Sequence, residues 1–78
     1  MVDEIDMSKK EKLEARIRNN TKQVSLDDFE SLVNKYGRIE MGGKHAKARI
    51  AKATLTYKRT NPMPPEYVSD LLEIIDTL

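Results

Sequence analysis

The fold of this chain is decided by the stretch Met41–Ile50, which reads MGGKHAKARI and holds two of the three glycines and the only histidine. Tight hairpin turns need positive φ, which glycine supplies without a Cβ clash, so the two glycines predict a turn between antiparallel strands. Because strand side chains alternate between faces, the second strand presents His45, Lys47 and Arg49 on one face and small apolar residues on the other. The predicted sheet therefore has one cationic face and one apolar face.

Strands are predicted on both sides of the turn at Gly42 and Gly43. Arg38–Met41 leads into this turn, and Ala53–Arg59, in which apolar and polar residues alternate, follows a second turn at residues 51–52. The second turn contains no glycine, so its backbone geometry is the least defined part of the sheet. Together the three strands predict an antiparallel meander.

Two amphipathic helices are predicted, one before the sheet and one after it. The first begins with Ser25 as N-cap and Asp28 three residues later, and it ends at Gly37. The second runs over Glu66–Thr77, and Pro65 suits its first turn. Both helices must bury an apolar stripe, and one face of the sheet provides the surface. The stripes consist of Leu26, Phe29, Leu32, Val33 and Tyr36 in the first helix and of Val68, Leu71, Leu72, Ile75 and Leu78 in the second.

A further helix is predicted over residues 8–20, beginning with a capping box formed by Ser8 and Glu11. Its apolar stripe is narrow, mainly Leu13 and Ile17, so we expect it to dock weakly or to lie outside the core. The predicted fold class is α+β, with a small three-stranded antiparallel sheet, helices packed on one face and this extra N-terminal helix. Residues 1–7 are interpreted as a disordered acidic leader, and residues 24–78 form the main domain.

The composition excludes several kinds of site. A chain of 78 residues is one small domain, which buries only about 60% of its unfolded surface, so a deep catalytic cleft is not expected. With no cysteine and one histidine, we expect no disulfide, no metal site and no cofactor. No apolar run approaches membrane-spanning length and the acidic start is unlike a secretory signal, so we expect a cytoplasmic protein without a membrane partner.

The charge is distributed unevenly along the chain. Residues 44–59 contain six Lys or Arg and no Asp or Glu, whereas residues 64–78 contain four Asp or Glu and no Lys or Arg. A basic block on a sheet favours a polyanion such as RNA or DNA, because Lys and Arg contacts with phosphate dominate the affinity of such complexes. The alternative is an ordinary solvated sheet face. The candidate phosphate-binding residues are Lys44, Lys47, Arg49, Lys58 and Arg59.

Three segments also carry a resemblance to a known family. Arg18–Phe29, RNNTKQVSLDDF, is similar to a lead-in to the first core helix, and Pro65–Ile75, PEYVSDLLEII, is similar to a closing helix. Between them, Gly43-Lys44-His45 follows a helix exit and a short strand, at the place of a Gly-Ser-His-type motif. In this order and spacing the segments, which span Arg18–Leu78, resemble the HicA family of toxin-antitoxin toxins.

The resemblance implies an α-β-β-β-α core similar to a double-stranded-RNA-binding domain. It also implies endoribonuclease activity on messenger RNA, with His45 as the catalytic residue, and a HicB-like antitoxin protein that covers the site. Lys44 stands where the family has serine. A lysine there either binds the scissile phosphate or marks a member that binds RNA without cutting it.

Metal-independent RNA cleavage needs a base for the ribose 2′-hydroxyl, an acid for the leaving oxygen and a cation for the phosphate. His45 suits one proton-transfer role, because imidazole titrates near neutral pH. The chain has no second histidine, so the other role falls to Tyr57, a lysine, water or His45 acting twice.

Three functions therefore stay open. The first is a HicA-like toxin that cleaves RNA with His45. The second is a non-catalytic RNA-binding module on the same fold, and the third is a protein-interaction domain whose basic sheet docks an acidic partner.

Overall fold

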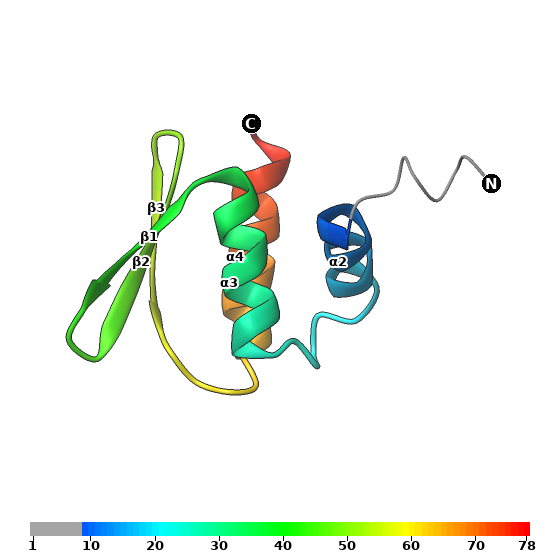
Figure 1. Ribbon diagram of the computed structural model, residues 1–78, viewed down its shortest axis with the longest axis horizontal. Helices are drawn as coiled ribbons and strands as arrows, with labels where there is room; N and C mark the ends of the chain where they lie inside the picture. The colour runs from blue at the N-terminus through cyan, green and yellow to red at the C-terminus, as the bar shows by residue number, and fades with distance from the viewer. Residues whose placement is uncertain (1–8) are drawn as a thin grey trace.

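The computed structural model describes residues 9–78, so the predicted leader 1–7 and the predicted capping residue Ser8 lie outside the described part. The chain forms a small α+β domain of three layers: the sheet, the helix pair α3 and α4, and helix α2 on the far side of that pair (Figure 1). The elements are α2 (Lys9–Asn19), α3 (Leu26–Tyr36), β1 (Arg38–Gly42), β2 (His45–Ile50), β3 (Ala53–Lys58) and α4 (Pro65–Asp76).

The sheet is the predicted antiparallel meander, with the strands in the order β1-β2-β3. Gly42 pairs with His45, so Gly42 is the last residue of β1 and the two turn residues are Gly43 and Lys44. The predicted turn at Gly42 and Gly43 is thus shifted by one residue. Gly43 has φ of 63°, the left-handed conformation that glycine adopts without a Cβ clash. In the second turn, Ala51 adopts φ of 54° without being a glycine.

Helix α3 begins and ends as the sequence predicts. The Ser25 side chain accepts a hydrogen bond from the backbone N–H of Asp28, at 3.1 Å, and so caps the first turn. At the other end, Gly37 donates its N–H to the carbonyl of Val33 and stops the helix. Gly37 is also a point of close approach, because a Cβ built there would lie 2.0 Å from the carbonyl oxygen of Arg49 in β2. Glycine at this position lets the helix exit pass against the backbone of the sheet.

Helix α4 has Pro65 in its first turn, as expected. Val68, Leu71 and Ile75 are buried, and Leu72, the partly buried residue of the predicted stripe, packs against the same core. The prediction for Leu78 is wrong, because the helix ends at Asp76 and the Leu78 side chain is 61% exposed.

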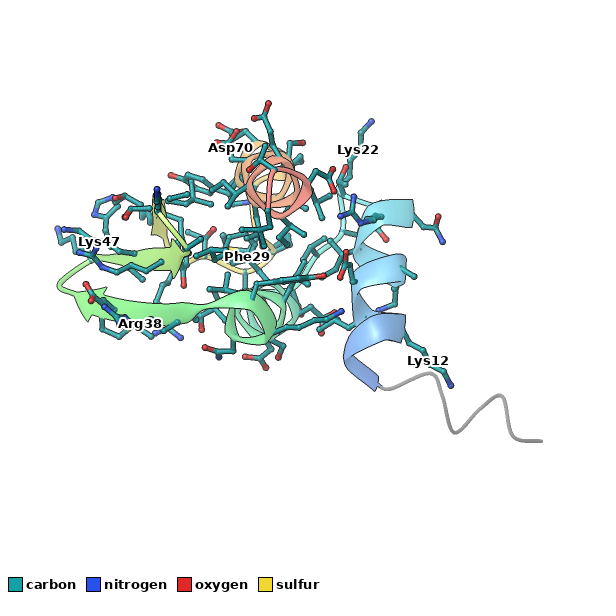
Figure 2. The ribbon with its side chains drawn as sticks, turned by 90° about the horizontal axis from the view of Figure 1, so that it is seen from above. Lys12, Lys22, Phe29, Arg38, Lys47 and Asp70 are labelled. Carbon is teal, nitrogen blue, oxygen red and sulfur yellow. The ribbon has the colours of Figure 1, made fainter. Side chains whose placement is uncertain are left out.

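The core lies between the helix pair and the apolar face of the sheet, as the alternation predicts. In β2, Ala46, Ala48 and Ile50 are buried. Tyr57 of β3 is fully buried and meets Phe29 of α3 edge to face, with ring centroids 4.8 Å apart. Figure 2 shows the Phe29 side chain between the sheet and the helices.

The N-terminal helix packs on the core, so the prediction that it lies outside the core is wrong. Leu13 and Ile17 of α2 are buried, at 9% and 2% exposed, and belong to the same apolar cluster as α3 and α4. Two apolar residues are enough to dock α2, because polar side chains of the same helix also form hydrogen bonds to α3 and α4.

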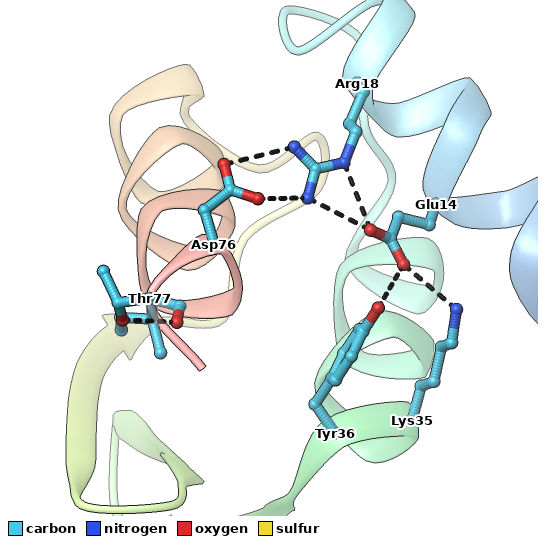
Figure 3. Close-up of polar contacts among 7 residues, drawn as sticks. Glu14, Arg18, Lys35, Tyr36, Asp76 and Thr77 are labelled. Atoms are coloured by element: carbon cyan, nitrogen blue, oxygen red, sulfur yellow. Dashed lines mark hydrogen bonds and ion pairs between the residues drawn. The ribbon is translucent and has the colours of Figure 1, made fainter.

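A charged cluster, shown in Figure 3, fastens α2 to both helices. The Glu14 carboxylate accepts hydrogen bonds from the Tyr36 hydroxyl, from Lys35 Nζ at 3.0 Å and from Arg18 Nε at 3.1 Å. Arg18 also donates to Asp76 of α4, with 2.8 Å between NH2 and Oδ1. The Tyr36 hydrogen bond, helped by Lys35 and Arg18 and opposed by burial, holds the pKa of Glu14 below its ordinary value.

Candidate nucleic-acid interface

The face of the sheet that points away from the helices carries the predicted cationic residues. Strand register places its side chains in three rows across the strands, and Figure 2 shows two of them, Arg38 and Lys47, on the side of the sheet opposite Phe29. The rows are Arg38–Arg49–Thr54, Glu40–Lys47–Thr56 and Gly42–His45–Lys58. None of these nine positions holds Phe, Tyr or Trp and His45 is the one aromatic ring among them, so the face offers mainly charge and hydroxyl groups rather than an extended stacking surface for bases.

The row at the β1–β2 turn holds the candidate catalytic residue. His45 is exposed, lies opposite Lys58 of β3, and directly follows Lys44 in the turn. A shallow depression here is lined by Glu40, Met41, Gly42, His45 and Lys47. Within residues 12–78, no carboxylate forms an ion pair with any of the three lysines around His45. Their ammonium groups therefore remain available to an anion.

The row at the other end is different, because a carboxylate of β1 engages its arginines. Glu40 Oε1 lies 2.7 Å from Arg49 Nε, and Glu40 Oε2 lies 3.3 Å from Arg38 NH2. The adjacent Arg49 guanidinium, with a smaller contribution from Arg38, lowers the pKa of the Glu40 carboxyl. Sequence reasoning assigned neither Arg38 nor Glu40 to the site. The signal was available, since period-two alternation in β1 carries both residues to the cationic face.

Arg59 does not lie free beside the other candidates. It forms a two-bond pair with Glu30 of α3, with Nε–Oε2 at 2.8 Å and NH2–Oε1 at 3.0 Å. Such fork-to-carboxylate geometry is among the stronger polar contacts in proteins. These contacts join the end of β3 to α3, and the assignment of Arg59 as a phosphate-binding residue stays a prediction.

Tyr57 is excluded as the second proton-transfer group by its place in the core. Its side chain is fully buried on the opposite side of the sheet from His45, and its hydroxyl donates to Glu30 Oε2 at 2.7 Å. Burial, followed by the hydrogen bond to Glu30, raises the pKa of Tyr57 far above its ordinary value. The remaining candidates for that role are the lysines, water and His45 itself.

Two other kinds of site are absent from the part of the chain that the structure describes. Among residues 9–78 there is no group of three or more His, Asp or Glu side chains that could hold a metal ion. No helix in the same range is long and apolar enough to cross a membrane. On the exposed sheet face, by contrast, Lys44, Lys47 and Lys58 lie around the imidazole of His45.

Comparison of the chain with protein-family models, with curated proteins and with solved structures gives no match.

Proposed function

We propose that the protein is a HicA-like toxin, a metal-independent endoribonuclease that holds messenger RNA on the exposed face of its sheet and cleaves it with His45. One observation carries the proposal. His45 lies on an open face with Lys44, Lys47 and Lys58 around it, and no carboxylate in residues 12–78 pairs with these lysines. The order of α3, β1, β2, β3 and α4 supports a fold similar to a double-stranded-RNA-binding domain.

The chemistry follows from this placement. The ribose 2′-oxygen attacks the neighbouring phosphorus, a new P–O2′ bond forms and the P–O5′ bond breaks, which leaves a 2′,3′-cyclic phosphate and a 5′-hydroxyl. A base must take the 2′-hydroxyl proton, and an acid must protonate the leaving 5′-oxygen. His45 supplies one transfer, and a lysine, water or His45 itself supplies the other. The ammonium groups of Lys44, Lys47 and Lys58 stabilise the charge that builds on the phosphate.

The direct test is RNA integrity after incubation of the purified protein with a mixed transcript in EDTA. We expect fragments with 5′-hydroxyl ends from the wild type and intact RNA from His45→Ala. Lys12→Ala is the matched control, because it removes an exposed cationic side chain from α2, on the far side of the helix pair, and should cleave normally. Equal cleavage by wild type and His45→Ala would refute the role of His45.

The second candidate is a non-catalytic RNA-binding module on the same face. It is favoured by the surroundings of His45, since Tyr57 points into the core and no carboxylate in residues 12–78 is hydrogen-bonded to the imidazole. This candidate predicts intact RNA from both proteins, together with binding that weakens steeply with salt. In either case, a HicB-like antitoxin would cover the same cationic face with an acidic surface. A third candidate, a protein-interaction domain, predicts tight binding of such a partner and no affinity for RNA.

A further inference from the structure

One carboxylate lies in the middle of the cationic face. Glu40 contacts Arg49 at 2.7 Å and Arg38 at 3.3 Å, and its direct cross-strand partner in β2 is Lys47. It is the only acidic residue among the nine outward positions of the sheet. A neutral residue at position 40 would give this face a higher affinity for phosphate, so Glu40 needs a functional explanation.

Glu40 divides the face into two unlike ends. At the end of the sheet near the β2–β3 turn, the Glu40 carboxylate pairs with both Arg38 and Arg49. At the β1–β2 end, the lysines beside His45 have no acidic partner within residues 12–78. Lys52, in the turn between β2 and β3, also has no ion pair within residues 12–78, so an incoming phosphate meets one unpaired lysine at that end and three at the end where His45 lies.

We infer that Glu40 is an internal competitor of the RNA phosphates, which pairs with Arg38 and Arg49 and so weakens phosphate binding at the end of the sheet opposite His45. This inference rests on the proposed RNA-binding function. A carboxylate and a phosphate make the same charge-assisted hydrogen bonds to guanidinium, so both compete for the same donors. Glu40 is attached to the neighbouring strand, which gives it a high effective concentration at the two arginines.

The competition predicts how variants behave. Because exposed ion pairs are weak, Glu40→Gln should tighten RNA binding by about 3- to 10-fold rather than by orders of magnitude. The salt dependence should steepen by about one further phosphate contact, since the freed arginines then displace counterions. Arg49→Gln should change binding by less than about 2-fold in the parent protein and by about 5-fold in the Glu40→Gln protein.

The experiment is a double-mutant cycle in the His45→Ala protein, so that the RNA stays intact. Binding of a short, fluorescently labelled RNA of mixed sequence is measured by anisotropy over a range of salt concentrations. The variants are Glu40→Gln, Arg49→Gln and their combination, and Lys58→Gln, in the row of His45 and not opposite Glu40, serves as a control whose effect should be the same with and without Glu40. Thermal unfolding of each variant, and of Glu40→Ala as a second replacement, checks that the fold is retained.

The outcomes separate the inference from the proposed function. Tighter binding by Glu40→Gln, with an Arg49→Gln effect that appears only in its presence, supports the inference. Equal affinity of parent and Glu40→Gln, or an Arg49→Gln effect that is the same in both, overturns the inference and leaves RNA binding intact. Absence of RNA binding in every folded variant overturns the proposed function and the inference together.

Discussion

Replacing Gly37 by alanine should lower the stability of this domain far more than replacing Gly42 or Gly43 by alanine. A Cβ at position 37 would lie 2.0 Å from the Arg49 carbonyl oxygen, 2.9 Å from its carbonyl carbon and 3.0 Å from Ile50 Cα, whereas ordinary contacts lie at 3.4–4 Å. All three atoms belong to the backbone of β2, so no side-chain rotation relieves the clash. The helix exit and the strand must move apart by more than 1 Å.

The magnitude follows from what that movement breaks. Overpacking against movable side chains costs about 1–3 kcal/mol, and a clash with strand backbone belongs at or above the upper end of that range. A domain of this length has a total stability of roughly 4–12 kcal/mol. We therefore expect Gly37→Ala to lower the free energy of unfolding by about 3 kcal/mol or more and the Tm by more than about 12 °C.

Gly43→Ala is the matched control, because the same methyl group is added where nothing lies within 4 Å. Its cost comes only from the positive φ of 63° and should be about 1 kcal/mol. Urea unfolding followed by circular dichroism measures both variants. A loss of 1 kcal/mol or less for Gly37→Ala, or equal losses for the two variants, would refute the close-approach argument.

Two further predictions concern the buried contacts. Tyr57→Phe removes the hydroxyl that donates to Glu30, while Arg59 still pairs with that carboxylate, so we expect a loss of about 1 kcal/mol in urea unfolding and unchanged RNA cleavage. Loss of cleavage at unchanged stability would place Tyr57 in the chemistry instead. The pKa values of Glu14 and Glu30 are lowered in the folded state from an ordinary value of 4.5, so the unfolded chain binds more protons. Their contribution to stability is therefore complete above pH 4.5 and is lost as the pH falls through their folded values, which Tm measurements on acidification would show. Glu14→Gln should flatten this pH dependence, and an unaltered slope would contradict the assigned contacts.

The sequence predicted the fold correctly wherever a local pattern is compatible with a single backbone structure. Strict alternation from His45 onward assigned the two faces of β2, and the Ser25 cap and Pro65 fixed the starts of α3 and α4. The turn was placed one residue early, because two adjacent glycines allow either register and the cross-strand pairs decide between them.

The docking of α2 was missed for another reason. Amphipathic periodicity measures the apolar stripe, whereas much of the attachment of α2 comes from Glu14 and Arg18, whose partners lie 21 to 58 residues away in sequence. The same limitation applies to the site. The sequence alone gives no partner for Arg59, because Glu30 comes beside it only in the folded chain. A count of charges over residues 44–59 also omits Glu40, which lies on the same face of the sheet but belongs to the preceding strand.

The meander has a consequence for how the chain folds. Each strand pairs only with its neighbour in sequence through a two-residue loop, so the sheet needs no long-range loop closure, and hairpins of this kind form in roughly 1–10 μs. A sheet of three short strands is nevertheless marginal until its apolar face is covered. Part of that cover is α4, which contributes Val68, Leu71 and Ile75 and follows the sheet in the chain. During synthesis, therefore, the sheet becomes rigid only after α4 has followed it, and we expect a chain truncated before α4 to lack an ordered sheet.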